Sequence, residues 1–272
     1  CPSCPLGYRL HMPHAEINGQ RIYFEDTGGN GPPVILAHGF LMDSEMFAPQ
    51  VAALRETHRV ITWDERGFGQ TDYDGKPFSY WDSAADCLGL LDHLDIDRAV
   101  IGGMSQGGFL SLRVALTAPD RVRGLVLLDT QAGVDDAETQ AANAGMNHVW
   151  LTEGPESGLA DMVASIIIDD PDCSPAWIAK WIARPKESFE QPYQCLSSRD
   201  DITDRLGEIT CPAIVVHGTE DTAITMDRAE ILADGLVGCS GVVKVSGAHA
   251  ANLTNPGPVN AAIVDFLAGL SA

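Results

Sequence analysis

Gly103-Met104-Ser105-Gln106-Gly107 is the stretch that decides the fold of this chain. It follows an apolar run at residues 99–101 that predicts a buried strand, and it precedes residues 109–116, whose pattern predicts a helix. A serine between two glycines at a strand-to-helix junction is the pattern of a nucleophile elbow. Because glycine has no side chain, strand and helix can approach closely on either side of the turn. We therefore expect the Ser105 hydroxyl to project from the end of a strand, above a helix N-terminus.

Strands and helices alternate on both sides of this elbow. Strands are expected at residues 16–24 (a hairpin turning at Asn18-Gly19), 34–37, 60–63, 99–101, 125–128, 214–216 and 242–245. Helices are expected at residues 46–56, 79–94, 109–116, 227–236 and 259–270. Short, fully apolar strands that alternate with helices predict an α/β fold with a doubly wound, mostly parallel sheet.

The alternation stops after the sixth expected strand and resumes only near residue 214. Residues 130–208 contain no strand pattern and are predicted to form short helices. A helical insertion between two parallel strands predicts a cap that crosses the C-terminal edge of the sheet. The expected division is a core of residues 12–130 and 209–272 with a cap at 131–208. Residues 1–11 are expected to be a leader or tag remnant.

Composition limits the classes of partner. The 272 residues include 38 acidic and 17 basic side chains, which gives a net charge of −21. Such a surface repels phosphate and anionic lipid, so nucleic acid and membranes are not expected as partners. No apolar run approaches the roughly 18 residues that span a bilayer, and a cytoplasmic location is predicted. The Cys1-Pro2-Ser3-Cys4 pair has no second pair to complete a metal site, so no metal is expected.

Two loops further along the chain carry the partners that a serine nucleophile needs. Serine requires a base to accept its proton, most often a histidine that is oriented by a carboxylate. Asp221 lies in the loop after residues 214–216, and His249 lies in the loop after residues 242–245. In a parallel sheet both loops emerge at the same edge as the elbow. The order Ser105, Asp221, His249 therefore predicts nucleophile, acid and base.

Other residues compete for the acid and base roles. Glu220 is adjacent to Asp221, and Asp129 ends the sixth strand, from which its carboxylate could reach the same histidine. Asp221 is favoured because its loop neighbours the His249 loop. The competing histidines that follow strands or lie in the cap are His38, His217 and His148. The first two each precede a glycine, which favours a buried ring that stabilises a turn.

An acyl-transfer site must also stabilise an oxyanion. Two backbone N–H groups directed at the developing charge lower the barrier by several kcal/mol. Gln106 starts the elbow helix, where free N–H groups and the helix dipole favour an anion. His38-Gly39-Phe40 follows the strand at 34–37 and is expected to supply the second N–H, that of Phe40.

These motifs resemble, in order, the landmarks of the α/β-hydrolase fold superfamily. The landmarks are His38-Gly39-Phe40, residues 64–71, the elbow, the Asp221 loop and Ala248-His249. The resemblance spans nearly the whole chain and implies a serine hydrolase with a helical cap, similar to the esterase and enol-lactonase branch. It implies no cofactor. Epoxide hydrolases and haloalkane dehalogenases of this superfamily carry aspartate where this chain has Ser105, which disfavours their chemistry.

The cap is expected to set the substrate. The residues expected to bind it are Phe40, His148, Trp150, Met162, Trp177 and Trp181. The leading prediction is cleavage of an ester or lactone of a medium-sized, mostly apolar small molecule through an acyl-enzyme. The alternatives are a carbon–carbon bond hydrolase, a cofactor-free perhydrolase, or a ligand receptor on a hydrolase scaffold. The sequence leaves the oligomeric state open, with a homodimer among the alternatives.

Overall fold

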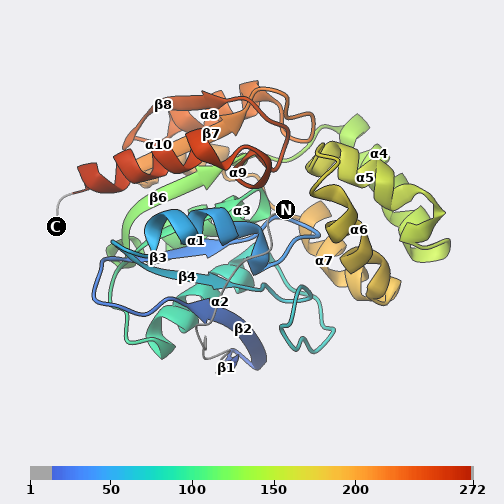
Figure 1. The fold of residues 1–272 in the computed structure, drawn as a ribbon, viewed down its shortest axis with the longest axis horizontal. Coiled ribbons are helices and arrows are strands. Elements are labelled where there is room, and N and C mark those ends of the chain that lie inside the picture. The colour runs from blue at the N-terminus through green and yellow to red at the C-terminus, as the bar shows by residue number, and fades with distance from the viewer. Residues whose placement is uncertain (1–13, 271–272) are drawn as a thin grey trace.

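One eight-stranded sheet organises residues 14–270, the part of the chain that the computed structural model describes (Figure 1). The expected leader at residues 1–11 and the Cys1–Cys4 pair lie outside these residues. The strands are β1 (His14–Ile17), β2 (Gln20–Asp26), β3 (Pro33–Ala37), β4 (Arg59–Trp63), β5 (Ala99–Met104), β6 (Val122–Leu128), β7 (Ala213–Gly218) and β8 (Cys239–Val245). Their order in the sheet is β1-β2-β4-β3-β5-β6-β7-β8.

The sheet is antiparallel only at the β1 end. β1 pairs with β2, and β2 pairs with β4, in antiparallel fashion, whereas all later pairs are parallel. The C-terminal ends of β3, β5, β6, β7 and β8 therefore meet at one edge. The fold class predicted from the alternation of strands and helices is confirmed.

The helices follow the expected positions with small differences at their ends. They are α1 (Ala48–Leu54), α2 (Tyr80–His93), α3 (Gln106–Thr117), α4 (Ala137–Thr152), α5 (Leu159–Ile167), α6 (Ser174–Ala183), α7 (Glu190–Ser197), α8 (Met226–Gly235), α9 (Ala251–Thr254) and α10 (Pro256–Gly269). Local chemistry sets several of these ends. The Ser79 and Asp82 side chains form a capping box at the start of α2, and Asp136 accepts from the Thr139 N–H at the start of α4, at 2.8 Å.

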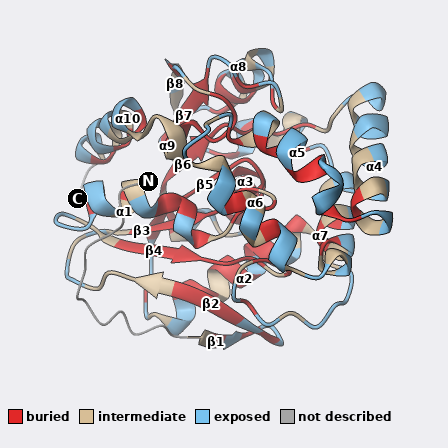
Figure 2. Ribbon diagram, turned by 45° about the vertical axis from the view of Figure 1, so that its right-hand side comes forward, coloured by how far each residue is buried: buried red, intermediate tan, exposed pale blue. Residues whose placement is uncertain are grey.

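Both faces of the sheet are covered by apolar side chains. One cluster includes Ile35, Ile101 and Leu127, and the other, on the opposite face, includes Leu36, Val100 and Val126. Neighbouring strand residues thus alternate between two buried layers, as a parallel sheet covered by helices requires. Figure 2 shows this buried interior in the strands, with exposed residues on the outer sides of the helices.

Helices α4 to α7 lie together beside one edge of the sheet (Figure 1). We call residues 137–197 the helical insertion; they connect β6 to β7 through a short 3₁₀ helix, Thr203–Glu208. Two of its side chains bind main-chain oxygens of the core. The Trp181 indole N–H donates to the Leu41 carbonyl at 2.6 Å, and Arg184 donates to the Gly67 carbonyl at 2.8 Å.

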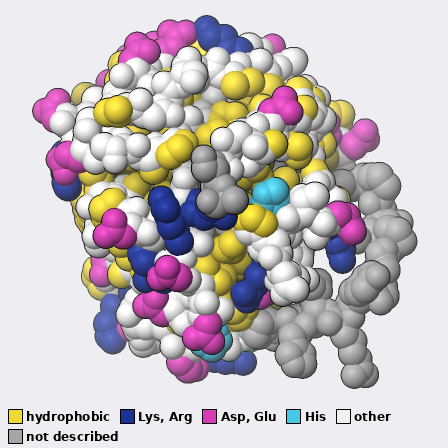
Figure 3. All heavy atoms as spheres, turned by 90° about the vertical axis from the view of Figure 1, so that its left-hand side faces the viewer, with side chains coloured by type: hydrophobic (Ala, Val, Ile, Leu, Met, Phe, Trp, Pro, Cys, Tyr) yellow, Lys and Arg dark blue, Asp and Glu magenta, His cyan; other side chains and the backbone are white. Residues whose placement is uncertain are grey.

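Charged residues are dispersed over the surface rather than collected in a tail. In Figure 3 acidic side chains are scattered across the visible face, between apolar and neutral groups. Among the helices of residues 14–270, none combines the length and the apolar character that a bilayer crossing would need.

Candidate active site

Ser105 occupies a strained turn between β5 and α3. Its φ of 52° and ψ of −113° lie in a region that side chains rarely adopt. The flanking glycines make this turn sterically feasible. A Cβ at Gly107 would lie 1.9 Å from the Ala37 carbonyl oxygen, and one at Gly103 would lie 2.5 Å from the same atom. The predicted close approach of strand and helix is therefore present, and Ser105 lies at the wall of a pocket.

His249 and Asp221 meet at the same edge of the sheet. The Nδ1 atom of His249 lies 2.8 Å from Oδ2 of Asp221. The other carboxylate oxygen, Oδ1, accepts from the N–H groups of Ala223 at 2.8 Å and Ile224 at 3.0 Å. Burial raises the pKa of Asp221, but His249 and these hydrogen bonds outweigh it and hold the pKa below its ordinary value. The carboxylate is thus kept charged and fixed in orientation beside the His249 ring.

Asp129, the alternative acid, is hydrogen-bonded to the main chain rather than to His249. Its Oδ1 accepts from the Gly218 N–H at 2.7 Å, and no hydrogen bond to His249 is found among the residues described. Burial, and then the nearby Asp221, raise its pKa well above the ordinary value, which favours the neutral form. The geometry therefore ties Asp129 to the main chain of β7 and leaves Asp221 as the carboxylate that contacts His249.

His217 lies behind this pair rather than in the pocket lining. Its Nε2 donates to the Ile224 carbonyl at 2.8 Å and lies 3.4 Å from Oδ2 of Asp221. Potential ligand atoms of His217, Asp129 and Asp221 lie within 4.8 Å of one another, close enough for a metal ion. Hydrogen bonds to the main chain and to His249 account for this clustering, and we assign no metal to it.

The two backbone N–H groups that are expected to bind an oxyanion have no main-chain acceptor among residues 14–270. Gln106 is the first residue of α3, so its N–H has no partner within the helix. The N–H of Phe40 donates to no other main-chain group in residues 14–270. His38 fixes the loop that carries Phe40, since its Nδ1 lies 2.8 Å from the Gly39 carbonyl and its Nε2 accepts from the Glu65 N–H at 3.0 Å.

The buried Glu65 is hydrogen-bonded to the side chain of Gln106, the residue that follows Ser105 in the elbow. The Gln106 side chain donates to Glu65 at 3.0 Å and accepts from the Tyr80 hydroxyl at 3.2 Å. The second carboxyl oxygen of Glu65 is buried and has no partner among the described residues. Burial raises the pKa of Glu65 to about 8. At neutral pH this carboxyl group therefore carries a proton, which avoids an uncompensated charge beneath the site.

Glu65→Gln is expected to change the pH dependence of stability. The folded-state pKa of about 8 exceeds the unfolded value near 4.5. The wild type therefore loses stability as pH rises from about 5 to 8, because ionisation is easier in the unfolded chain. The variant lacks this loss. The difference in unfolding free energy between the variant and the wild type should therefore rise by a few kcal/mol from pH 5 to 8, on the order of the free energy that corresponds to the pKa shift of Glu65.

Urea unfolding of both proteins at intervals between pH 5 and 9 measures this difference. Glu56→Gln is the matched control, since Glu56 is an exposed glutamate. Parallel pH profiles for the wild type and Glu65→Gln would show that Glu65 is already ionised in the folded protein.

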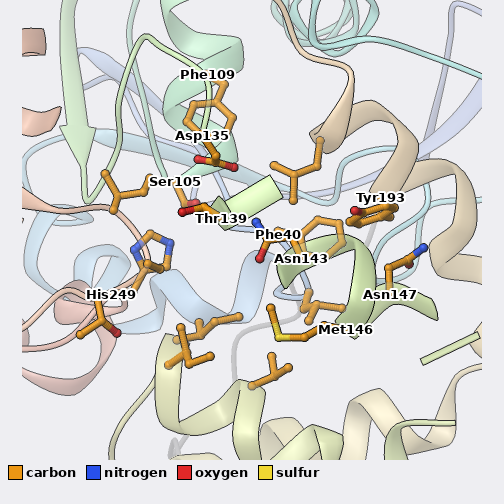
Figure 4. Close-up of a pocket in the computed structure, with 18 of the residues that line it drawn as sticks. Phe40, Ser105, Phe109, Asp135, Thr139, Asn143, Met146, Asn147, Tyr193 and His249 are labelled. Atoms are coloured by element: carbon orange, nitrogen blue, oxygen red, sulfur yellow. The ribbon is translucent and has the colours of Figure 1, made fainter. Parts of the chain in front are cut away.

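The pocket that contains Ser105 and His249 has a volume of about 260 Å³. Its apolar lining includes Phe40, Leu41, Met146, Trp150, Ile167 and Phe189. Its polar lining includes Gln131, Asp135, Asn143, Asn147, Tyr193 and Arg199. Ser105 and His249 lie on one side of this space, and Asn147 and Tyr193 lie on the opposite side (Figure 4).

The structure brings only part of the expected substrate-binding set to this pocket. Phe40 and Trp150 line it, whereas the other four expected residues do not. His148 is exposed because it follows the pocket-facing Asn147 by one position, which turns it toward solvent. Met162 is 45% exposed. Trp177 and Trp181 are buried in the packing of α6, where Trp181 contacts the Leu41 carbonyl.

Sequence reasoning missed the polar lining. Thr139, Asn143, Asn147 and Trp150 recur at helical spacing on α4 and all face the pocket. The spacing of three to four residues can be read from the sequence and places these side chains on one face of a helix. Asparagine on a helix is ordinarily a solvent-facing residue, so this spacing alone does not predict a pocket lining.

Comparison with known proteins agrees with this architecture. A family model described as the alpha/beta hydrolase fold matches residues 32–155. A protein of Azorhizobium caulinodans proposed to be the carbamate hydrolase RutD is 28% identical, covering 94% of this chain and 98% of its own length.

Two solved structures are similar over nearly their whole length. The enol-lactonase from Burkholderia xenovorans LB400 has a TM-score of 0.86 and 29% identity, covering 94% of this chain and 100% of its own. A thermophilic esterase from Thermogutta terrifontis has a TM-score of 0.85 and 27% identity, covering 98% and 100%. With the parallel sheet, the serine elbow and the helical insertion already described, these matches show that the chain has the α/β-hydrolase fold and resembles hydrolases that share it.

Proposed function

We propose that this protein is a serine hydrolase that cleaves a carboxylic ester or lactone through an acyl-enzyme. The observation that carries the proposal is the 2.8 Å contact between His249 Nδ1 and Asp221, in a pocket shared with Ser105. With Nδ1–H donated to the carboxylate, His249 presents an unprotonated Nε2 that can accept the serine proton.

The proposed reaction has two halves. Ser105 Oγ attacks the carbonyl carbon, its proton passes to His249 Nε2, and the backbone N–H groups of Phe40 and Gln106 stabilise the oxyanion. His249 then protonates the leaving alcohol, and the acyl group remains on Ser105. In the second half His249 removes a proton from the water that attacks the acyl-enzyme, and it returns this proton to Ser105 Oγ as the acid is released. In a lactone the leaving alcohol stays attached to the acyl chain, so one hydroxy acid is released.

A fluorophosphonate probe is expected to label one site, Ser105. The probe reports on a serine whose hydroxyl is activated by a base. Trypsin cleavage gives residues 99–113, a peptide that also contains Ser111, so fragment ions must place the label. His249→Ala should slow the labelling strongly because the hydroxyl loses its base.

The same protein should turn over an aryl ester repeatedly, which a ligand receptor would not. Label at Ser111 or elsewhere, or equally fast labelling of the His249→Ala variant, would contradict the proposed mechanism. A panel that adds a lactone, a carbamate and a carbon–carbon dicarbonyl substrate separates ester chemistry from the alternatives.

A further inference from the structure

The pocket wall formed by α4 and α7 carries polar groups that the reaction does not use. Asn143 and Asn147 project from one face of α4, and Tyr193 approaches from α7 (Figure 4). No hydrogen bond of these three side chains to any described residue is found. Asn143, Asn147 and Tyr193 are each half-buried at the pocket wall. A purely apolar substrate would remove water from these groups without replacing its hydrogen bonds.

Two deeply buried polar atoms in the same lining also lack partners. Gln131 is 3% exposed, and its Oε1 has no partner, although its Nε2 donates to Asp135 at 3.0 Å. Trp150 is 5% exposed, and its indole N–H is equally unpaired. An unpaired buried polar group costs about 1–3 kcal/mol. Both atoms are closed off from the pocket, so the donors and acceptors that a ligand can reach are the side-chain amides of Asn143 and Asn147, which a ligand with both kinds of group satisfies best.

The charged residues of this pocket neutralise each other. Arg199 pairs with Asp135 at 2.8 Å, and its side chain is 4% exposed. The guanidinium also donates to the Leu196 carbonyl at 2.9 Å and lies over the Phe109 ring at 4.8 Å. Arg199 is therefore not free to bind a substrate carboxylate, and a carboxylate placed here would also meet Asp135.

We infer that the substrate carries an uncharged amide in its chain beyond the scissile carbonyl, held by the side-chain amides of Asn143 and Asn147. An amide supplies one N–H donor and one carbonyl acceptor without net charge. An alkyl chain supplies neither, and a carboxylate supplies only acceptors and a charge. This inference rests on the proposed ester or lactone cleavage and adds the substrate class to it.

Three p-nitrophenyl esters of matched chain length test the inference. They are the hexanoate, the N-acetyl-β-alaninate, which replaces the middle of that chain by an amide, and the adipate monoester, which ends in a carboxylate. For the wild type we expect kcat/KM to be about tenfold higher for the amide ester than for the hexanoate, from one to two net hydrogen bonds. The adipate monoester should be the poorest substrate.

The variant Asn143→Leu/Asn147→Leu should lower the ratio of kcat/KM for the amide ester over the hexanoate by about 10- to 100-fold. The change should appear mainly in KM, because these residues bind the substrate away from the reacting atoms. Gln194→Leu is the matched control, since it removes an exposed amide from α7 that does not line the pocket. Its ratio should equal that of the wild type.

The outcomes separate this inference from the proposed function. If the hexanoate is hydrolysed but the wild type prefers it, or prefers the adipate monoester, the amide inference is wrong and ester cleavage stands. An unchanged ratio in the double variant also overturns it. If no ester is hydrolysed and the fluorophosphonate does not label Ser105, the proposed function itself fails.

Discussion

Ser105→Ala is expected to abolish ester hydrolysis while the protein remains folded. The hydroxyl is the proposed nucleophile, and its loss leaves only oxyanion stabilisation and binding, so kcat should fall by at least about 10³-fold. Stability should change little, because alanine meets the same backbone strain at φ 52° and the lost hydroxyl faces the pocket rather than the core. Steady-state kinetics and a thermal melt, measured on the same preparation, test both parts.

Ser111→Ala is the matched control for this experiment. Ser111 lies on α3, six residues after Ser105, but its hydroxyl donates to the Gly107 carbonyl at 2.6 Å inside the protein. This variant should lose about 1 kcal/mol of stability and keep its activity. Residual activity of Ser105→Ala above about a thousandth of wild type would remove Ser105 from the proposed role.

Asp221→Asn is expected to lower kcat by about 10²- to 10⁴-fold in a folded protein. The reason lies in the two N–H groups of Ala223 and Ile224, which donate to Oδ1 of this side chain. They would hold the amide oxygen of the asparagine in that place and turn its NH₂ toward His249. The ring must then accept at Nδ1 and carry its proton on Nε2, where it can no longer accept the proton of Ser105.

Asp129→Asn distinguishes the two candidate acids. Since Asp129 accepts from the Gly218 N–H, asparagine can keep that hydrogen bond through its amide oxygen. Its kcat should stay within about tenfold of wild type, far above that of Asp221→Asn. A larger loss for Asp129→Asn at equal stability would assign the acid to the end of β6, with the fold and the reaction class unchanged.

The fold was predictable because its signals are local. Short apolar strands such as Val34 to Ala37, and the glycines around Ser105, reflect the nearby backbone geometry. The start of β8 at Cys239 was missed because Cys239-Ser240-Gly241 has no apolar pattern, and this edge strand pairs with only one neighbour. The placement of the Asp221 and His249 loops at the same edge of the sheet as Ser105 followed from the parallel topology alone.

The substrate-binding residues were less predictable because they depend on how the insertion packs. Aromatic side chains on α6 were expected in the pocket, but Trp181 is only 1% exposed and is buried against the core. Burying a large apolar side chain between two layers is more favourable than leaving it in a cavity. The pocket wall also includes polar residues such as Asn143, whose helical spacing along α4 is shared by solvent-facing residues and so does not by itself predict a pocket.

The hydrogen bonds that hold the helical insertion to the core affect which residues of such an enzyme can change during evolution. Trp181 and Arg184 hold main-chain oxygens, those of Leu41 and Gly67, so neither hydrogen bond needs a particular core side chain as its acceptor. Gly67 itself is restricted, because a Cβ there would lie 2.5 Å from Pro192 of α7. The side chain of Leu41 and the pocket-facing side chains of α4 can change without removing these two hydrogen bonds. Under the proposed function, selectivity and chemistry are carried by different parts of one chain, so changes on a single face of α4 would open this scaffold to new substrates.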